Sequence, residues 1–134
     1  MKMRVISSKE EIDTISKNEK MIHIAFRPSN TDILAVISKC PYLKAIQIPP
    51  SYKRTISKST QMLFEMQNIS LIEGDISEHR KDTNEYSELS QEIYDKIDQY
   101  LSEGLTEKEI KEKMLLFTTL SNELLGFLIK SRKQ

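Results

Sequence analysis

Four short apolar runs punctuate the first half of the chain, and each is followed by a polar stretch. The runs cover residues 3–6, 21–26, 45–48 and 69–72, and they are rich in isoleucine and valine. Short apolar runs of β-branched residues bounded by polar or proline-containing segments are typical of buried strands. We therefore predict four strands in this half of the chain.

The spacing of these strands predicts how they pair. Apolar pairs recur at steps of 24 and then 23 residues, in Ile22 and Ile24, Ile46 and Ile48, and Ile69 and Leu71. One helix fills each interval, and strand–helix–strand units of this length pair in parallel through right-handed crossovers. The fold class is therefore α/β, a small four-stranded, mostly parallel sheet with flanking helices. A solenoid of β-α repeats has a similar period, but the imperfect repeats favour the open sheet.

Helix starts can be placed from capping residues. Ser8 and Glu11 have the spacing of a capping box, which starts a helix carrying Ile12 and Ile15. Ser29 or Asn30 caps a second helix after Pro28. A third helix follows the polar loop after residue 50, with its apolar stripe at Ile56, Met62, Leu63, Phe64 and Met66.

The second half of the chain is expected to be helical. Residues 73–84 are polar and predict a linker, at about 73–85, between an α/β module (1–76) and a helical extension (77–134). The next helix ends at Gly104, a left-handed stop. Its apolar stripe consists of Tyr86, Leu89, Ile93, Tyr94, Ile97, Tyr100 and Leu101.

A second capping box, Thr106 with Glu109, starts the last helical segment. Two continuations are open: one helix over residues 106–131, which would form a hairpin with the preceding helix, or a helix-turn-helix-like extension. We favour the single helix, because neither Gly nor Pro occurs between Gly104 and Gly126. Either form is compatible with a homodimer through the C-terminal helices.

The segment GLTEKEIKEKM resembles the first helix of a helix-turn-helix motif. That resemblance implies a recognition helix from Thr118 to Lys130. The side chains it would bring to nucleic-acid bases are Thr118, Thr119, Ser121 and Asn122, with Gly126 on the same exposed face, and those for phosphates are Lys130, Arg132 and Lys133.

The net charge of zero hides a segregation along the chain. Residues 1–59 have a balance of +6, residues 60–104 of −8, and residues 105–134 of +2. A basic N-terminal part indicates a surface that attracts anions. The single Cys40 excludes an internal disulfide and is expected to be a small buried side chain, while His23 is expected in the core rather than as a ligand. No metal site and no cofactor are predicted.

The loops that follow parallel strands converge at one edge of the sheet, where ligands of such sheets bind. Cationic and hydroxyl side chains next to helix amides suit a phosphate or carboxylate. We therefore predict an anion site, with Arg27, Lys53, Arg54 and Lys58 as main contacts, although strand-end loops are also polar simply because they are solvated. The full set, called the rim below, is Arg27, Ser29, Asn30, Ser51, Tyr52, Lys53, Arg54, Thr55, Ser57, Lys58, His79 and Arg80.

Catalysis is not favoured. Glu73, Asp75 and His79 are candidates for a general base, but no catalytic residue is assigned, because the chain lacks G-x-G-x-x-G, P-loop, C-x-x-C and G-x-S-x-G motifs. No apolar window approaches the length of a membrane span, and the first residues lack the apolar stretch of a signal peptide. A cytoplasmic protein that does not enter membranes is expected.

The runs MRVISSKEEID, IHIAFRPSN, PPSYKRTISKS and LIEGDISEHRKD resemble a family of small archaeal proteins, found in methanogens, that is a domain of unknown function. The resemblance implies a cytoplasmic archaeal protein and brings no activity. Two functions remain as hypotheses. The first is a non-catalytic regulatory or nucleic-acid-associated protein, and the second is a binding protein or enzyme for a phosphorylated or carboxylate-bearing small molecule at the rim.

Overall fold

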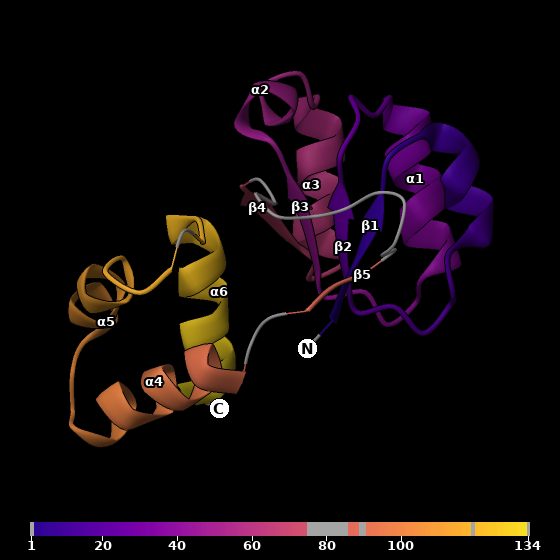
Figure 1. The fold of residues 1–134 in the computed structure, drawn as a ribbon. Helices are drawn as coiled ribbons and strands as arrows, with labels where there is room; N and C mark the ends of the chain where they lie inside the picture. The colour runs from indigo at the N-terminus through magenta and orange to yellow at the C-terminus, as the bar shows by residue number, and fades with distance from the viewer. Residues whose placement is uncertain (1, 75–85, 89–90, 119, 134) are drawn as a thin grey trace. The chain divides into compact units, whose positions relative to one another are not determined.

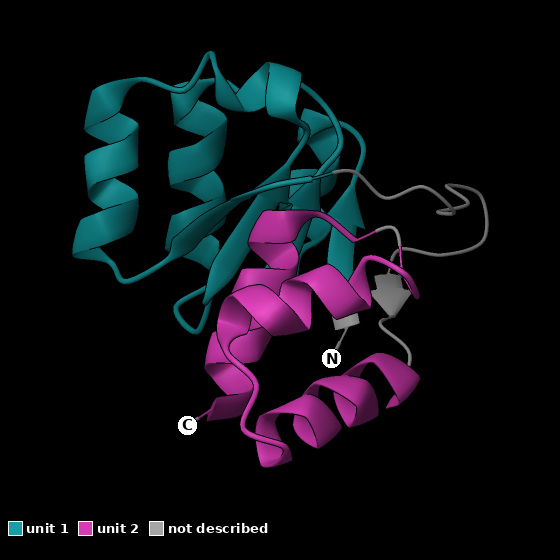
Figure 2. Cartoon of the chain, turned by 90° about the vertical axis from the view of Figure 1, so that its left-hand side faces the viewer, with its two compact units in different colours: residues 1–88 teal, residues 89–134 magenta. Residues whose placement is uncertain are grey.

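A computed structural model describes residues 2–74, 86–88, 91–118 and 120–133. The chain divides into two compact units, residues 1–88 and residues 89–134 (Figure 2). The first unit contains every strand of the described chain and the second contains three helices. Each unit is described separately.

The N-terminal unit is built on a five-stranded sheet with the order β4-β3-β2-β1-β5 (Figure 1). Its strands are β1 (Lys2–Ile6), β2 (Met21–Ile24), β3 (Ala45–Ile48), β4 (Ser70–Glu73) and β5 (Tyr86–Glu88). The first four pair in parallel, each with its neighbour in sequence, so the predicted parallel sheet is confirmed and is open rather than a solenoid.

The fifth strand was not predicted. Tyr86 was expected in a helical stripe, whereas it pairs with Arg4 of β1 in an antiparallel ladder. A short polar segment carries little strand periodicity of its own, and the open edge of β1 supplies the hydrogen bonds that make it a strand.

The helices of this unit are the 3₁₀ helix η1 (Lys9–Thr14), α1 (Asn30–Lys39), the short α2 (Pro50–Lys53) and α3 (Lys58–Met66). Of these, η1 and α1 begin where the capping residues predict, whereas the cap of α3 at Ser57 was not predicted. Glu11 accepts a hydrogen bond from the Ser8 amide at 2.9 Å, as expected of the first capping box. Helix α2 was not predicted. It begins with Pro50, whose fixed φ and missing N–H suit a first helical turn.

One face of the sheet holds the main core. Isoleucines of the strands alternate onto this face and pack with side chains from η1, α1 and α3, in a cluster that includes Ile22, Ile46, Val36 and Phe64. Right-handed crossovers between strands that are neighbours in sequence place all their helices on the same face, and Figure 1 shows α1 and α3 there.

The apolar stripe predicted for α3 is partly wrong. Met62 and Met66 are 60% and 77% exposed, whereas Thr60 and Phe64 face inward and are buried. Residues 60 and 64 are one helical turn apart on the side that meets the sheet. The hydroxyl of Thr60 is accommodated there because it is hydrogen-bonded.

The alternate strand residues point to the opposite face of the sheet. The row across it is Val5, His23, Gln47 and Ile72, as the strand register requires. All four are buried. His23 is therefore a core residue, as the sequence predicts.

The C-terminal unit consists of α4 (Gln91–Ser102), α5 (Glu107–Met114) and α6 (Asn122–Lys133), each in contact with the other two. Gly104 has a φ of +82° and ends α4, as predicted. The capping box at α5 is also confirmed, because the Glu109 amide donates to Thr106 Oγ1 at 3.3 Å and the Thr106 amide donates to Glu109 Oε1 at 3.0 Å.

The single helix over residues 106–131 is wrong, because α5 ends at Met114 and α6 begins at Asn122. Hydroxyl side chains compete with the helix here. Thr118 Oγ1 accepts from the Leu120 amide at 3.3 Å, and Ser121 Oγ accepts from the Leu124 amide at 3.1 Å. A new helix therefore starts after Ser121 without any Gly or Pro in between.

The core of the C-terminal unit includes Ile97 of α4, Ile110 and Met114 of α5, and Leu124 and Leu128 of α6, all at most 1% exposed. Gly126 lies at the contact of α6 with α5, since a Cβ placed on it would be 3.1 Å from Lys111 Cε. In the described part of the chain, no helix has the length and apolar character needed to cross a lipid bilayer.

Candidate anion site at the strand ends

The carboxyl ends of β2 and β3 lead to the N-termini of two helices. Ile24 is followed by the segment that starts α1 at Asn30, and Ile48 is followed by α2 and then α3, which starts at Lys58. Because β2 and β3 are parallel neighbours, both helix starts lie at the same edge of the sheet.

Asn30, the first residue of α1, joins the two helix starts. Its Oδ1 accepts a hydrogen bond from Thr60 Oγ1 at 2.9 Å and lies 3.5 Å from Ser57 Oγ, the N-cap hydroxyl of α3. Ser57 Oγ also accepts from the Thr60 amide at 3.2 Å. The two rim residues Asn30 and Ser57 are thus brought together, 27 residues apart in the chain.

The two helix starts differ in charge. At α1, Ser29 and Asp32 form a reciprocal cap with distances of 3.1 and 3.0 Å, so a carboxylate already occupies the positive end of this helix. At α3 the first turn contains no acidic residue, and Lys58 is its first residue. The first amides of an α-helix have no intrahelical acceptor. The α3 start is therefore the better place for an external anion.

Arg27 lies against the aromatic ring of Tyr52, with its Cζ 5.5 Å from the ring centroid. Arg27 follows β2 and Tyr52 follows β3, so the parallel pairing of these strands again explains the approach. Stacking on an aromatic face holds a guanidinium in place and leaves its N–H edge available for a second partner. This pair supplies a positioned cation at the same edge as the α3 start.

The remaining rim residues form the exposed side of the segment between β3 and α3. Ser51, Arg54, Thr55 and Lys58 are exposed, and Lys53 is half-buried. Thr55 Oγ1 donates to the Tyr52 carbonyl at 2.7 Å, which tightens the turn after α2. His79, Arg80 and Asp75 lie outside the described residues, so their predicted places at this edge stay predictions.

Thr60 is the residue at this edge that the sequence did not single out. Its hydroxyl is within hydrogen-bonding distance of Asn30 and Ser57, and its side chain is buried. A signal was present in the sequence, because a threonine three residues after a capping serine lies on the turn that the cap closes. What the sequence does not show is that Asn30, from another helix, completes the group.

Two other titratable side chains, His23 and Cys40, are buried in the N-terminal unit. Gln47 Nε2 lies 3.0 Å from His23 Nδ1 between adjacent strands, so the amide donates and the ring nitrogen accepts. The Cys40 thiol is buried, and burial, followed by the negative charge of Glu19, raises its pKa. Among the described residues, no group of three or more His, Cys, Asp or Glu side chains is arranged to hold a metal ion.

The residues implied for nucleic-acid contact are only partly exposed. Gly126 was expected on the exposed face of a recognition helix, but it is buried against α5, because a glycine lets the two helices approach closely. Arg132 donates both from Nε and from Nη2 to Asp98 of α4. Lys130, Lys133 and Asn122 are exposed, Thr118 and Ser121 are half-buried and cap local turns, and Thr119 lies outside the described residues.

Comparison with known protein families finds a match for the N-terminal unit. The model of a family of unknown function (DUF1699), N-terminal domain, matches residues 2–85. The chain belongs to this family. The match includes β1 to β4 and every rim residue. No curated protein and no solved structure matches the chain. The function of this family is unknown, so the match supplies no activity for the chain.

Proposed function

We propose that the N-terminal unit is a non-catalytic binding module that takes a phosphate or carboxylate group of a small molecule at the carboxyl ends of β2 and β3. The observation that carries the proposal is the hydrogen bond from Thr60 to Asn30. It fixes the α1 start beside the acid-free α3 start.

The charges at this edge support an anionic ligand. Arg27 is positioned by Tyr52, and Lys58 and Arg54 flank the α3 start and are exposed. A charged group bound by backbone amides and a guanidinium fork makes short, charge-assisted hydrogen bonds. We therefore expect Arg27, Arg54, Lys58 and the amides of the first α3 turn to contact the ligand.

The ligand is expected to be a phosphorylated small molecule, and its binding is expected to regulate rather than to start a reaction. The described rim residues are cations, hydroxyls and an amide, with no nucleophile–base pair among them. Cytoplasmic location and archaeal origin stay predictions, and the single buried thiol of Cys40 suits a reducing compartment.

Thermal unfolding of the full chain with inorganic phosphate and a panel of phosphorylated metabolites tests the proposal. Binding to the folded state alone raises stability by about 2.7 kcal/mol when the ligand is at 100 times its dissociation constant. Lys58→Ala and Arg54→Ala should abolish the stabilisation. Lys44→Ala is the matched control, because Lys44 is exposed and precedes the opposite end of β3.

Two results would contradict the proposal. The first is the absence of stabilisation by any member of the panel at millimolar concentration. The second is an equal loss of stabilisation in Lys44→Ala, which would show that net charge alone attracts the anions.

Nucleic acid is a second source of phosphate groups, and exposed Lys130 and Lys133 are the observation in its favour. Binding of a mixed-sequence duplex should then fall steeply with salt and weaken in the Lys130→Ala/Lys133→Ala variant. An affinity that is unchanged by salt and by this double substitution would exclude nucleic acid as the ligand. Lysines at the end of α6 also interact favourably with the helix dipole, which explains them without a ligand.

A further inference from the structure

Three consecutive large apolar side chains are exposed between α5 and α6. Leu115, Leu116 and Phe117, called the apolar turn below, are 54%, 84% and 55% exposed. Met114, the residue before them, is fully buried. The apolar turn therefore follows directly on a core residue, and its own side chains are exposed.

The apolar turn is held in a defined conformation. The Leu116 amide donates to the Lys113 carbonyl at 3.2 Å, and the Phe117 amide donates to the Met114 carbonyl at 2.9 Å. Lys96 Nζ lies 4.9 Å from the centre of the Phe117 ring. A preorganised apolar surface loses little conformational entropy on binding, which is typical of an interaction site.

The charged residues around the apolar turn have both signs. Lys96 of α4 lies over the Phe117 ring, and Glu92 precedes it by one helical turn. Glu112 and Lys113 lie in the last turn of α5, so there are two negative and two positive groups. Residues 89–134 contain seven Lys and Arg and eight Asp and Glu, a balance of −1. Nucleic acid or an anionic membrane would be matched by an excess of positive charge, which this unit lacks.

We propose that the apolar turn is the centre of a symmetric interface with a second copy of this chain. In a two-fold interface the same patch meets itself, so each apolar turn covers the other. A border with both signs is self-complementary, because the lysines of one copy face the glutamates of its partner. The small apolar centre predicts a reversible dimer rather than an obligate one.

Sedimentation equilibrium of the full chain, from low micromolar to several hundred micromolar, measures this association. The average mass of the wild-type chain should rise from 15.6 kDa toward twice that value. Leu116→Glu should keep the chain monomeric at every concentration. Met66→Glu is the matched control, because Met66 is a similarly exposed apolar residue of α3 and its substitution should leave the dimer intact.

Circular dichroism should show that both variants keep the wild-type helix content, since neither side chain is in the core. A wild-type chain that stays monomeric at all concentrations overturns the proposal, as does unchanged association of Leu116→Glu. If a monomeric wild-type chain sediments with vesicles rich in anionic lipid and Leu116→Glu does not, the apolar turn is a membrane contact and the dimer is likewise excluded.

Discussion

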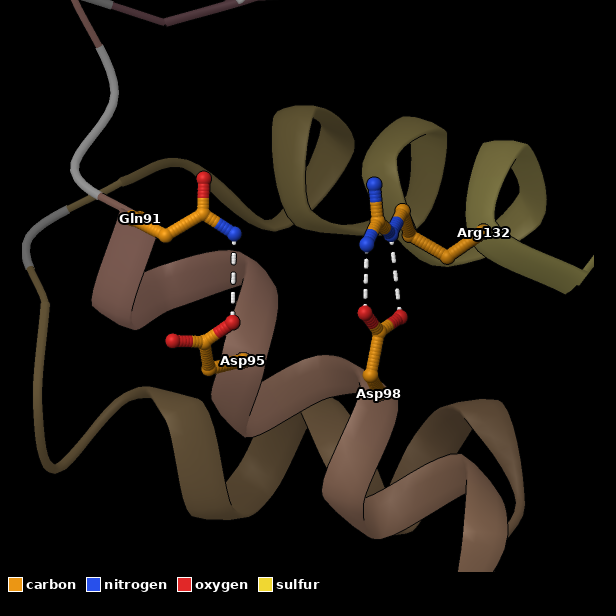
Figure 3. A network of polar contacts seen from close by, with 4 residues as sticks. All are labelled: Gln91, Asp95, Asp98 and Arg132. Atoms are coloured by element: carbon orange, nitrogen blue, oxygen red, sulfur yellow. Dashed lines mark hydrogen bonds and ion pairs between the residues drawn. The ribbon is translucent and has the colours of Figure 1, made fainter.

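Asp98 of α4 and Arg132 of α6 form a two-point ion pair between helices that begin 31 residues apart (Figure 3). Arg132 Nε donates to Asp98 Oδ1 at 2.9 Å and Nη2 donates to the other carboxylate oxygen. The guanidinium also lies over the Tyr94 ring, 5.1 Å from its centre. The pair holds α6 against α4, so the Arg132 side chain makes a structural contact.

This ion pair predicts an acid-sensitive C-terminal unit. The hydrogen bond from Arg132 lowers the pKa of Asp98 below its ordinary value of 3.8. The stabilisation is therefore present above pH 3.8 and is lost as the pH falls through the lower pKa of the folded state. Thermal unfolding as a function of pH should show that Asp98→Asn removes this part of the pH dependence. Asp95→Asn, on the same helix, should retain it, and equal profiles for both variants would contradict this role of the pair.

The capping serine of α3 is expected to support both fold and site. Ser57→Ala removes the acceptor of the Thr60 amide and should lower the free energy of unfolding by about 1 kcal/mol. Ser59→Ala, an exposed position in the same helix, should change it by less than about 0.5 kcal/mol. Urea unfolding measures both. A Ser57→Ala variant as stable as Ser59→Ala would show that the cap contributes nothing.

Substitution of Gly104 is expected to lower the free energy of unfolding through backbone conformation alone. Its φ is +82° and a Cβ there would meet no atom within 4 Å, so substitution causes no clash. Gly104→Ala should nevertheless lower the free energy of unfolding by about 1–2 kcal/mol, because an L-residue is disfavoured in the left-handed region. Asparagine tolerates this region better, so Gly104→Asn should cost less than Gly104→Ala in the same denaturation experiment. The reverse order would refute the explanation.

The buried pair of Gln47 and His23 on the sheet predicts a larger loss of stability on substitution. Gln47→Leu leaves the buried His23 Nδ1 without the amide that donates to it, and should lower the free energy of unfolding by about 1–3 kcal/mol. Gln67→Leu, at the exposed end of α3, is the control and should be nearly neutral. Chemical denaturation of the two variants provides the comparison. A neutral Gln47→Leu would mean that the pair adds no net stability.

The thiol of Cys40 should be unreactive in the folded protein. Burial raises its pKa, so less thiolate is present at neutral pH, and its side chain is 2% exposed. Labelling with a thiol reagent should be slow in buffer and rapid in denaturant. Rapid, complete labelling of the folded chain would contradict this placement and would indicate local opening around the end of α1.

The four parallel strands and the starts of η1, α1 and α5 could be predicted because their determinants are local. The isoleucine runs define the parallel strands, and the caps at Ser8, Ser29 and Thr106 each satisfy amides within their own first turn. The α5–α6 break was not predicted, because a segment without Gly or Pro favours a continuous helix. Ser121 caps α6 in the same way as Thr106 caps α5, so this serine is the sequence signal for the new helix.

The candidate site could be predicted only as a set of segments. Parallel pairing implied that the loops after β2 and β3 share an edge, and the Arg27–Tyr52 contact lies there. The sequence could not show that Asn30 of α1 meets Ser57 and Thr60 at the α3 start. That contact joins elements about 30 residues apart.

By itself, the sequence determined the α/β class, the parallel pairing and the caps at Ser8, Ser29 and Thr106. Periodicity and capping act over a few residues, and crossover handedness acts over one strand–helix–strand unit. Only the tertiary structure decided which polar residues meet. In the structure, residues 86–88 pair with β1 as an edge strand, Arg132 pairs with Asp98, and Thr60 donates a hydrogen bond to Asn30. The apolar turn is exposed. The first three of these features depend on partners distant in sequence, which no local pattern specifies.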